Sequence, residues 1–244
     1  MSKVKPRLIS GGHKGAEAEF GRAAKRFGLE QTTLSFEGHV MEWPMSVRVL
    51  GDEELAKGDI SMEMVSRRMG RTYHQADLIR RVIQSLYHMV NEAHQVFVVG
   101  QIQSDDTVKG GTGWAVELAR LFNRPVWVYD QTRGDWFHWR EGRWTPDSPA
   151  IGERTFCGTG TRNLTEDGRA AIDALFRRSF GEPVAKAGPG SGRPAARPAA
   201  VPPQPSAESS ASRTAASSAR VVKGLASSRA PASRPLSRRA ISSL

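Results

Sequence analysis

Residues 96–122 read VFVVGQIQSDDTVKGGTGWAVELARLF, and this run sets the expected fold class. Val96-Phe97-Val98-Val99 is a continuous apolar run, which is typical of a central parallel strand that is buried on both faces. Residues 112–122 have helical periodicity, and glycines at 110, 111 and 113 lie between the two segments. The run therefore predicts a strand, a glycine-containing turn and a helix.

The same alternation extends in both directions along the chain. We expect further strands over residues 7–10, 32–36, 125–129 and 155–158, and further helices over residues 16–27, 52–70, 75–93 and 165–180. Thr165 is the expected N-cap of the last helix, with Glu166 and Asp167 in its first turn. Trp136–Trp144 resembles a hairpin that turns at Glu141-Gly142. This order predicts a Rossmann-like, doubly wound, mainly parallel α/β sheet flanked by helices, with a small Trp-rich hairpin.

The charge of the 244-residue chain is unevenly distributed. The formal net charge is +10, but residues 183–244 contain ten Lys and Arg against one acid, Glu208. Residues 1–182 are nearly neutral. We therefore expect a Rossmann-like ligand-binding domain over 1–182 and a disordered, basic tail rich in Ala, Ser, Pro and Arg over 183–244. The tail is either a weak tether to nucleic acid or an acidic partner, or a solubilising extension.

Cysteine and histidine usage limits the kinds of site that are expected. The single cysteine, Cys157, excludes an intrachain disulfide and a multi-thiolate zinc site within one chain. His74, His88, His94 and His138 lack ligand spacing on one face, so no metal site is expected. The charged start MSKVKPRLIS is unlike a secretory signal, and no apolar run has transmembrane length. These features predict a cytoplasmic protein with no membrane partner.

Three glycine-rich turns follow expected strands and open expected helices. The first turn is Gly11–Gly15, the second is Lys109–Gly113, and the third is Cys157–Arg162. In a parallel sheet such turns lie at the carboxyl ends of strands, where glycine allows close approach and helix N-termini attract anions. Neither a Walker A loop nor a G-x-G-x-x-G fingerprint is present, which lowers the support for P-loop phosphoryl transfer and for NAD-dependent hydride transfer. We expect the turns to bind a phosphate-bearing ligand through Gly11, Gly12, His13, Gly15, Lys109, Gly110, Gly111, Thr112, Gly113, Gly158, Thr159, Gly160 and Arg162.

The second turn carries a family resemblance. Lys109–Glu117, KGGTGWAVE, is similar to the P-G-G-x-G-T-x-x-E motif of the Lonely-guy and lysine-decarboxylase-like proteins of the SLOG superfamily. Gly11-Gly12-x-x-Gly15 resembles the opening of the YpsA and molybdenum-cofactor-carrier-like branches. The resemblance covers residues 7–180 in organisation and implies a Rossmann-like fold that binds a nucleotide or a nucleotide-derived ligand. In the phosphoribohydrolase branch the motif's glutamate helps to cleave an N-glycosidic bond, a role that would fall on Glu117.

The chain departs from that motif in several places. Lys109 replaces the proline, Trp114 replaces the threonine, and the linker 100–108 is longer than in the hydrolase branch. In the hydrolase branch an arginine on the preceding helix pairs with the glutamate. The corresponding position in this chain falls near Ser85, where arginine is absent, and Arg80 and Arg81 lie about one helical turn upstream. These differences favour binding by a sensor or carrier over a nucleoside 5′-monophosphate phosphoribohydrolase. A third interpretation is a DprA-like, DNA-associated protein that uses its basic tail, although the neutral body counts against it.

Other side chains have two interpretations each. Asp130 ends a strand, where an acid either meets a ribose hydroxyl or caps a turn. Trp114 lies inside the glycine motif and is expected to lean over a ligand ring or to close the pocket. Asp105 and Asp106 are either ligands of a metal or ribose, or solvated acids. The arginines either grip phosphate or form a solvated helix face, and they are Arg67, Arg68 and Arg71. The tryptophans near the hairpin either stack on a base or cover the sheet edge, and they are Trp127, Trp136, Trp139 and Trp144.

Oligomeric state is the last expectation. Members of the resembled superfamily often pair through helices, and the long helices expected over residues 52–93 are suited to that role. The sequence therefore allows a homodimer as well as the small-molecule partner.

Overall fold

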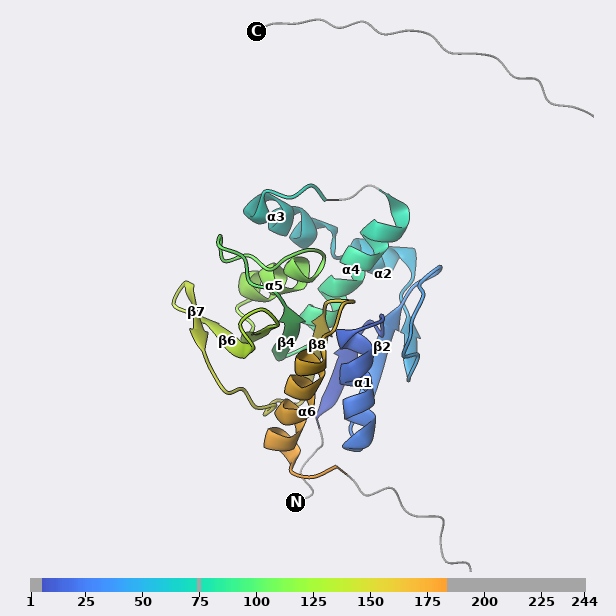
Figure 1. Ribbon diagram of the computed structural model, residues 1–244. Coiled ribbons are helices and arrows are strands. Elements are labelled where there is room, and N and C mark those ends of the chain that lie inside the picture. The colour runs from blue at the N-terminus through green and yellow to red at the C-terminus, as the bar shows by residue number, and fades with distance from the viewer. Residues whose placement is uncertain (1–5, 74–75, 184–244) are drawn as a thin grey trace, which may run out of the picture. The chain divides into compact units, whose positions relative to one another are not determined.

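A computed structural model describes residues 6–73 and 76–183 of the chain (Figure 1). Strands and helices alternate along these residues. In chain order they are β1 Arg7–Ser10, α1 Ala16–Arg26, β2 Glu30–Ser35, β3 Val47–Val49, α2 Asp52–Ala56, α3 Asp59–Met69, α4 Asp77–Asn91, β4 Gln95–Gly100, α5 Thr112–Leu121, β5 Val126–Asp130, β6 Asp135–Arg140, β7 Arg143–Pro146, β8 Thr155–Gly160 and α6 Glu166–Phe180.

The strands form one sheet in the order β3-β2-β1-β8-β4-β5-β6-β7. The first six strands in this order are parallel, whereas β6 and β7 run antiparallel to their neighbours. Every residue of β4 is buried, and the strand lies between β8 and β5. The apolar run over residues 96–99 is thus the central parallel strand that the sequence predicts.

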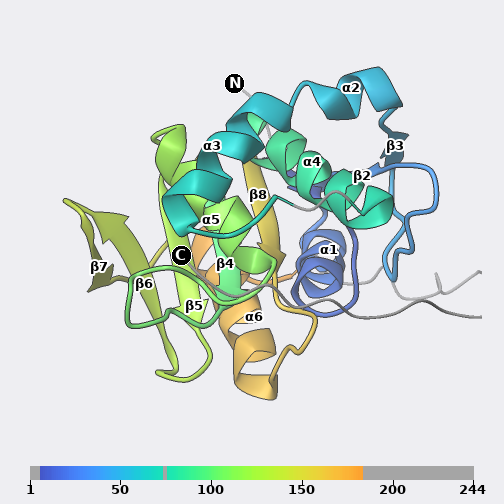
Figure 2. The same ribbon diagram turned by 90° about the horizontal axis from the view of Figure 1, so that it is seen from above.

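Helices cover both faces of the sheet (Figure 2). Phe97 and Val99 of β4 pack in a cluster with residues of α1 and α6. Val96 and Val98, which point the opposite way, pack in a second cluster with residues of α2, α3, α4 and α5. One strand therefore supplies both cores by its two-residue periodicity. The predicted Rossmann-like, doubly wound α/β architecture is confirmed.

The chain changes direction across the sheet at β8. From β1 it passes through α1 to β2, toward the β3 edge, whereas from β4 it passes through α5 to β5, toward the opposite edge. β8 enters last, between β1 and β4. The carboxyl ends of these three strands therefore form the topological switch point, which is where ligands bind in open α/β sheets.

Two local predictions need correction. Residues 52–70 form two helices rather than one, with a break at Lys57-Gly58. A Cβ atom at Gly58 would lie 2.9 Å from the Cβ atom of Tyr87, so glycine allows the start of α3 to approach α4 closely. The edge strand β3 was not predicted, because its three residues leave Val47 and Val49 exposed and lack an apolar pattern.

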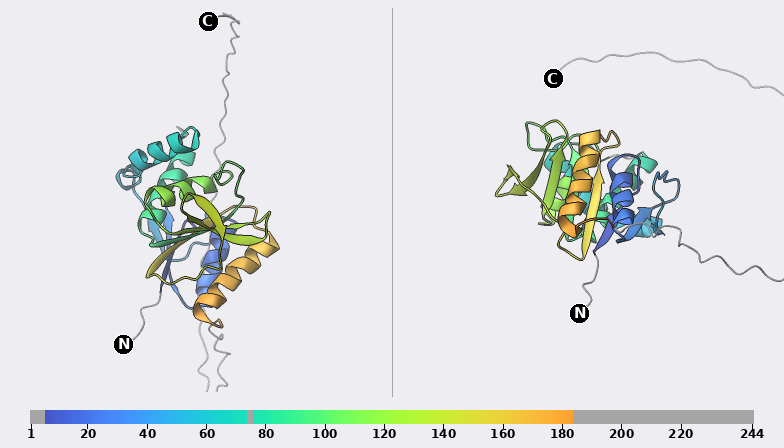
Figure 3. Two further views of the ribbon diagram at one scale, coloured as in Figure 1. Left: turned by 90° about the vertical axis from the view of Figure 1, so that its left-hand side faces the viewer. Right: turned by 60° about the horizontal axis from the view of Figure 1, so that its bottom comes forward.

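The predicted hairpin is confirmed as β6 and β7, at the sheet edge opposite β3 (Figure 3). Glu141 and Gly142 both have positive φ, 50° and 75°, as a two-residue type I′ turn requires. Trp139 and Trp144 pair across the hairpin with ring centroids 5.1 Å apart. These two rings pack against the core, in agreement with the interpretation that they cover the sheet edge.

The last helix and the tail after it were both subjects of prediction. Thr165 is the N-cap of α6, because its side chain accepts a hydrogen bond from the Gly168 N–H at 3.0 Å. Beyond Pro183 the tail lies outside the described residues, so its predicted disorder stays a prediction. No helix in residues 6–73 and 76–183 is long and apolar enough to cross a membrane.

Candidate functional site

The third glycine-rich segment is not a turn. Residues 157–160 belong to β8, and the loop begins at Thr161. Gly158 lies inside the sheet, where a Cβ atom would be 2.6 Å from Cγ of Phe20. The glycine is explained by this close packing of α1 on β8. The turn expected over 157–162 therefore begins only at Thr161. The glycine pattern did not reveal this, because Gly158 is required by a helix that packs on the strand.

The first turn, Gly11–Gly15, follows β1 as expected, but it is closed by the protein's own groups. The N–H of Gly12 donates to Ser10 Oγ at 3.1 Å, and the N–H of His13 donates to Glu17 Oε2 at 3.0 Å. Gly12 has a φ of 70°, and a Cβ atom there would lie 2.6 Å from the carbonyl oxygen of Trp43. The N–H groups of Gly12 and His13 are therefore committed to internal contacts.

Glu17 is the centre of that arrangement, and the sequence did not single it out. Its buried carboxylate also lies 3.0 Å from Nδ1 of His13 and accepts a hydrogen bond from the Thr159 hydroxyl at 2.7 Å. Burial alone would raise the pKa of Glu17, but the contacts with His13 and Thr159 outweigh it and lower the pKa below its ordinary value. Glu17 therefore joins the loops after β1 and β8 as an ionised group.

His39 was also missed, and it completes a cluster of polar side chains at the ends of β1, β2 and β8. Its Nε2 atom lies 2.9 Å from Nε2 of His13, and its Nδ1 atom lies 3.3 Å from Ser35 Oγ. Its ring stacks on Phe36 with centroids 4.6 Å apart. Burial, followed by the positive charges of His13 and Arg162, lowers the pKa of His39 to about 4. His39 is thus neutral at pH 7.

Arg162 lies beside this cluster, in the loop that follows β8. Among the described residues it makes no ion pair, and its side chain is exposed. A Cβ atom at Gly15 would lie 2.6 Å from the Arg162 carbonyl oxygen, so the loops after β1 and β8 are in contact. The structure therefore places the backbone of Arg162 against the loop that contains His13.

The second turn offers free backbone donors. In the described part of the chain the N–H groups of Gly110, Gly111 and Thr112 donate to no acceptor. Nothing lies within 4 Å of a Cβ atom built at Gly110 or Gly111, and both glycines are exposed. Lys109 is exposed beside them and forms no ion pair there. The N-terminus of α5 can therefore receive an anion from solvent.

The long linker before this turn is held in one shape by Arg71. The guanidinium group donates to the carbonyl oxygens of Gly110 at 3.0 Å and Val108 at 3.1 Å, and to Oε1 of Gln103 at 3.0 Å. Asp105 accepts two hydrogen bonds from Thr107, one from its N–H and one from its hydroxyl. Arg71 and Asp105 are therefore structural residues of the linker in this structure.

Glu117 lies in α5 and is buried. Its carboxylate pairs with Arg120, one turn later, and lies 3.9 Å from Nε of Arg68 in α3. The Arg120 guanidinium carbon is 3.5 Å from the ring centroid of Trp139. Arg80 and Arg81, which sequence spacing suggested as partners, instead pair with acids of α2, α3 and α4, namely Asp52, Asp59 and Asp77.

Two other predicted ligand residues lie in the protein interior. Trp114 is 4% exposed and packs on Tyr73, with ring centroids 5.9 Å apart. Asp130 is 1% exposed and accepts hydrogen bonds from the N–H groups of Ile102 at 3.2 Å and Thr132 at 2.9 Å. Asp130 therefore ties the loops after β4 and β5 together, which is the turn-capping alternative.

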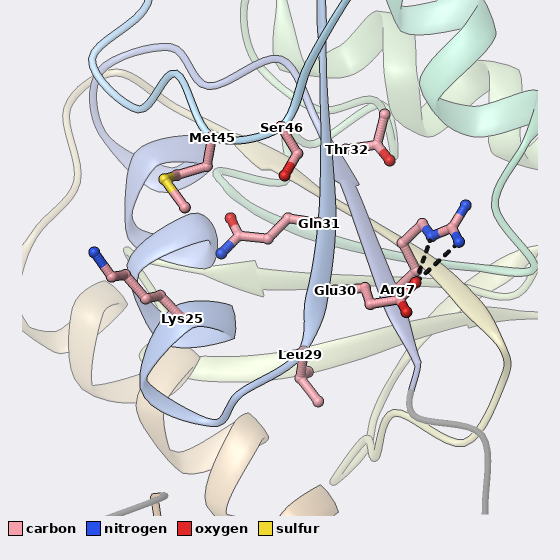
Figure 4. A pocket seen from close by; sticks show the side chains of 8 residues that line it. All are labelled: Arg7, Lys25, Leu29, Glu30, Gln31, Thr32, Met45 and Ser46. Carbon is pink, nitrogen blue, oxygen red and sulfur yellow. Dashed lines mark hydrogen bonds and ion pairs between the residues drawn. The ribbon is translucent and has the colours of Figure 1, made fainter. Parts of the chain in front are cut away.

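Two surface hollows lie away from the predicted site. One, of about 410 Å³, borders the amino-terminal half of β2, and the ion pair between Arg7 and Glu30 lies at its side (Figure 4). The other, of about 460 Å³, lies over α3 and the start of α4, beside Tyr73. Arg67 lines the second hollow, and the other residues considered as ligand contacts line neither. Lys109, Gly110, Gly111 and Arg162 are instead exposed in loops at the carboxyl edge.

The chain was compared with protein families, curated proteins and solved structures. No protein-family model matches the chain, and no curated protein matches it. Among solved structures, the chain is similar to a candidate molybdenum carrier protein from Syntrophus aciditrophicus, at 12% sequence identity and a TM-score of 0.43. The match covers 71% of this chain and 94% of that chain. This degree of similarity assigns neither a family nor a ligand.

Proposed function

We propose that the chain binds a nucleotide or a nucleotide-derived molecule at the carboxyl edge of its sheet, as a sensor or carrier. The observation that carries the proposal is the free N-terminus of α5, at the switch point of the sheet. Three backbone N–H groups and the adjacent Lys109 are available there to an anion. A helix dipole favours negative charge at the same place.

The similarity of the second turn to the SLOG motif supports the same ligand class. That motif includes Gly110 and Gly111, which lie between β4 and α5, and Gly113, which lies in the first turn of α5. A Cβ atom at Gly113 would lie 2.2 Å from the Val108 carbonyl oxygen, so only glycine fits there. We propose that the chain is a divergent member of this superfamily.

Ligand binding is tested by thermal stabilisation of the full-length protein. The panel contains mononucleotides, cyclic nucleotides, NAD, ADP-ribose and molybdopterin-like compounds. A ligand at about 100 times its dissociation constant adds roughly 2.7 kcal/mol of stability. Lys109→Ala should weaken the response, while Lys57→Ala, which removes an exposed lysine after α2, should leave it unchanged. No stabilisation by any compound would refute the proposal.

A second candidate function, a phosphoribohydrolase, is favoured by one observation. Glu117 has guanidinium groups beside it from Arg120 and Arg68, although no arginine occupies the position near Ser85. A carboxylate held in this way can stabilise an oxocarbenium-like state during N-glycosidic cleavage.

The reaction products distinguish a hydrolase from a protein that only binds its ligand. If the chain is a hydrolase, incubation with nucleoside 5′-monophosphates releases free base, and Glu117→Gln lowers the rate by roughly two to four powers of ten. If it is a binder, chromatography detects no base while thermal stabilisation persists.

A further inference from the structure

We propose that the phosphate end of the ligand binds to side chains of the histidine–arginine cluster, defined as His13, His39 and Arg162. This inference rests on the proposed nucleotide-type ligand and names a second anchoring point besides the N-terminus of α5. The three residues come from the loops after β1, β2 and β8, so the cluster is assembled only by the folded sheet.

Part of the backbone of the first turn is not available for this role. Its N–H groups at Gly12 and His13 are taken by Ser10 and Glu17, and the Ala16 N–H donates to the Thr161 carbonyl oxygen at 3.0 Å. An anion that approaches α1 therefore meets side chains as well as the remaining backbone N–H groups. Among the described residues, Arg162 and the exposed Lys14 of the turn itself are positively charged and form no ion pair.

Glu17 offsets part of the positive charge around His39, because its carboxylate acts to raise the pKa of His39. Its carboxylate is already bonded by the His13 backbone N–H, the His13 ring and the Thr159 hydroxyl. The carboxylate is also buried beneath the His13 ring, which is partly exposed. An incoming anion thus meets the imidazole rings and the guanidinium group, with Glu17 on the inner side.

The charges around His39 make ligand binding and protonation depend on each other. The groups that act on it are His13 from the loop after β1, Glu17 of α1 and Arg162 from the loop after β8. Burial, followed by the charge interactions with His13 and Arg162, holds the pKa of His39 at about 4, against an ordinary value of 6.5. An anion among these groups offsets their repulsion and raises that pKa. Binding should therefore take up a proton, and affinity should increase as the pH falls through about 5 toward 4.

The test follows the histidine rings of the full-length protein by ¹⁵N NMR during pH titration. Sulfate is the probe, because it mimics phosphate and does not itself titrate above pH 4. We expect saturating sulfate to raise the pKa of His39 by about one unit, which is roughly a tenfold gain in proton affinity. Sodium chloride at equal ionic strength should not reproduce the rise. His94, exposed and outside the cluster, serves as the internal control.

Substitutions distinguish this inference from the proposed function. Arg162→Gln should abolish the sulfate-dependent rise, and Arg162→Gln and His39→Gln should each weaken stabilisation by a phosphate-bearing ligand about tenfold or more in affinity. If a nucleotide stabilises the protein and neither variant alters its affinity, the inference is wrong and the proposed function stands. If no compound stabilises the wild-type chain and sulfate leaves His39 unchanged, both fail.

Discussion

The hydroxyl of Thr159 in β8 donates a hydrogen bond of 2.7 Å to the buried carboxylate of Glu17 in α1 and thereby links this strand to this helix. The two residues are 142 positions apart in the chain. Their contact holds the loops after β1 and β8 against each other. Thr159, which we expected to contact the ligand directly, thus acts in this structure through Glu17.

Loss of this hydrogen bond should be costly. Thr159→Val preserves shape but leaves one oxygen of a buried carboxylate without its donor, so we expect a loss of about 1–3 kcal/mol in the free energy of unfolding. Urea denaturation measures the change. Thr72→Val, at an exposed position, is the matched control and should change stability by less than about 0.5 kcal/mol. Equal effects of the two substitutions would show that the bond contributes nothing.

Stability should fall as the solution is acidified, for two reasons with the same sign. The folded-state pKa of Glu17 lies below its ordinary value of 4.5, so its stabilising contribution is present above pH 4.5 and is lost on acidification through the lower folded-state pKa. The pKa of His39 is also depressed, to about 4, so the unfolded chain binds more protons between pH 6.5 and pH 4.

These two contributions can be separated by pH range. His39→Gln should flatten the dependence of the unfolding free energy between pH 6.5 and pH 4, whereas Glu17→Gln should flatten it below pH 4.5. Chemical denaturation at several pH values measures both slopes. A wild-type curve that is flat from pH 7 to pH 4 would contradict the assigned environment of His39.

Gly158→Ala tests the reason given for the glycine in β8. The new methyl group would lie 2.6 Å from Cγ of Phe20, and Phe20 is fully buried, so the ring has little room to move. We expect a loss of about 1–3 kcal/mol from overpacking. Gly152→Ala is the control, because nothing lies within 4 Å of a Cβ atom there. A stable Gly158→Ala protein would mean that the glycine serves another purpose.

Arg71→Ala should loosen the linker 101–111 without unfolding the sheet. The substitution removes the donors to Gly110, Val108 and Gln103, so we expect faster trypsin cleavage after Lys109 and faster amide exchange in the linker. Arg67→Ala is the control, since that exposed side chain pairs only with Glu63 at 3.6 Å. Unchanged cleavage in Arg71→Ala would show that other contacts hold the linker.

The sequence predicted the features that depend on local pattern. The apolar run at 96–99, the N-cap at Thr165 and the turn at Glu141-Gly142 all gave correct elements, because burial, capping and turn geometry leave short-range signals. The overall α/β class followed from the order of these elements. The break at Gly58 was missed because its cause, the side chain of Tyr87, lies far along the chain.

The candidate site was only partly predictable for the same reason. Glu17 resembles any acid in the first turn of a helix, and His39 is a single histidine beyond a strand. Their importance comes from Thr159 and His13, which the fold brings to them. The one available signal was position: Glu17 comes two residues after a glycine turn, and His39 comes soon after a strand end.

The contacts of Arg71 have a consequence for protein engineering. The residues of the linker 101–111 do not by themselves fix its shape, because the guanidinium group that contacts Gly110, Val108 and Gln103 belongs to Arg71, just after α3. Transplanting the linker and its glycines into another Rossmann-like protein would therefore not transfer its conformation. A successful graft must also carry an arginine after the neighbouring helix, so the transferable unit is two segments that are distant in sequence.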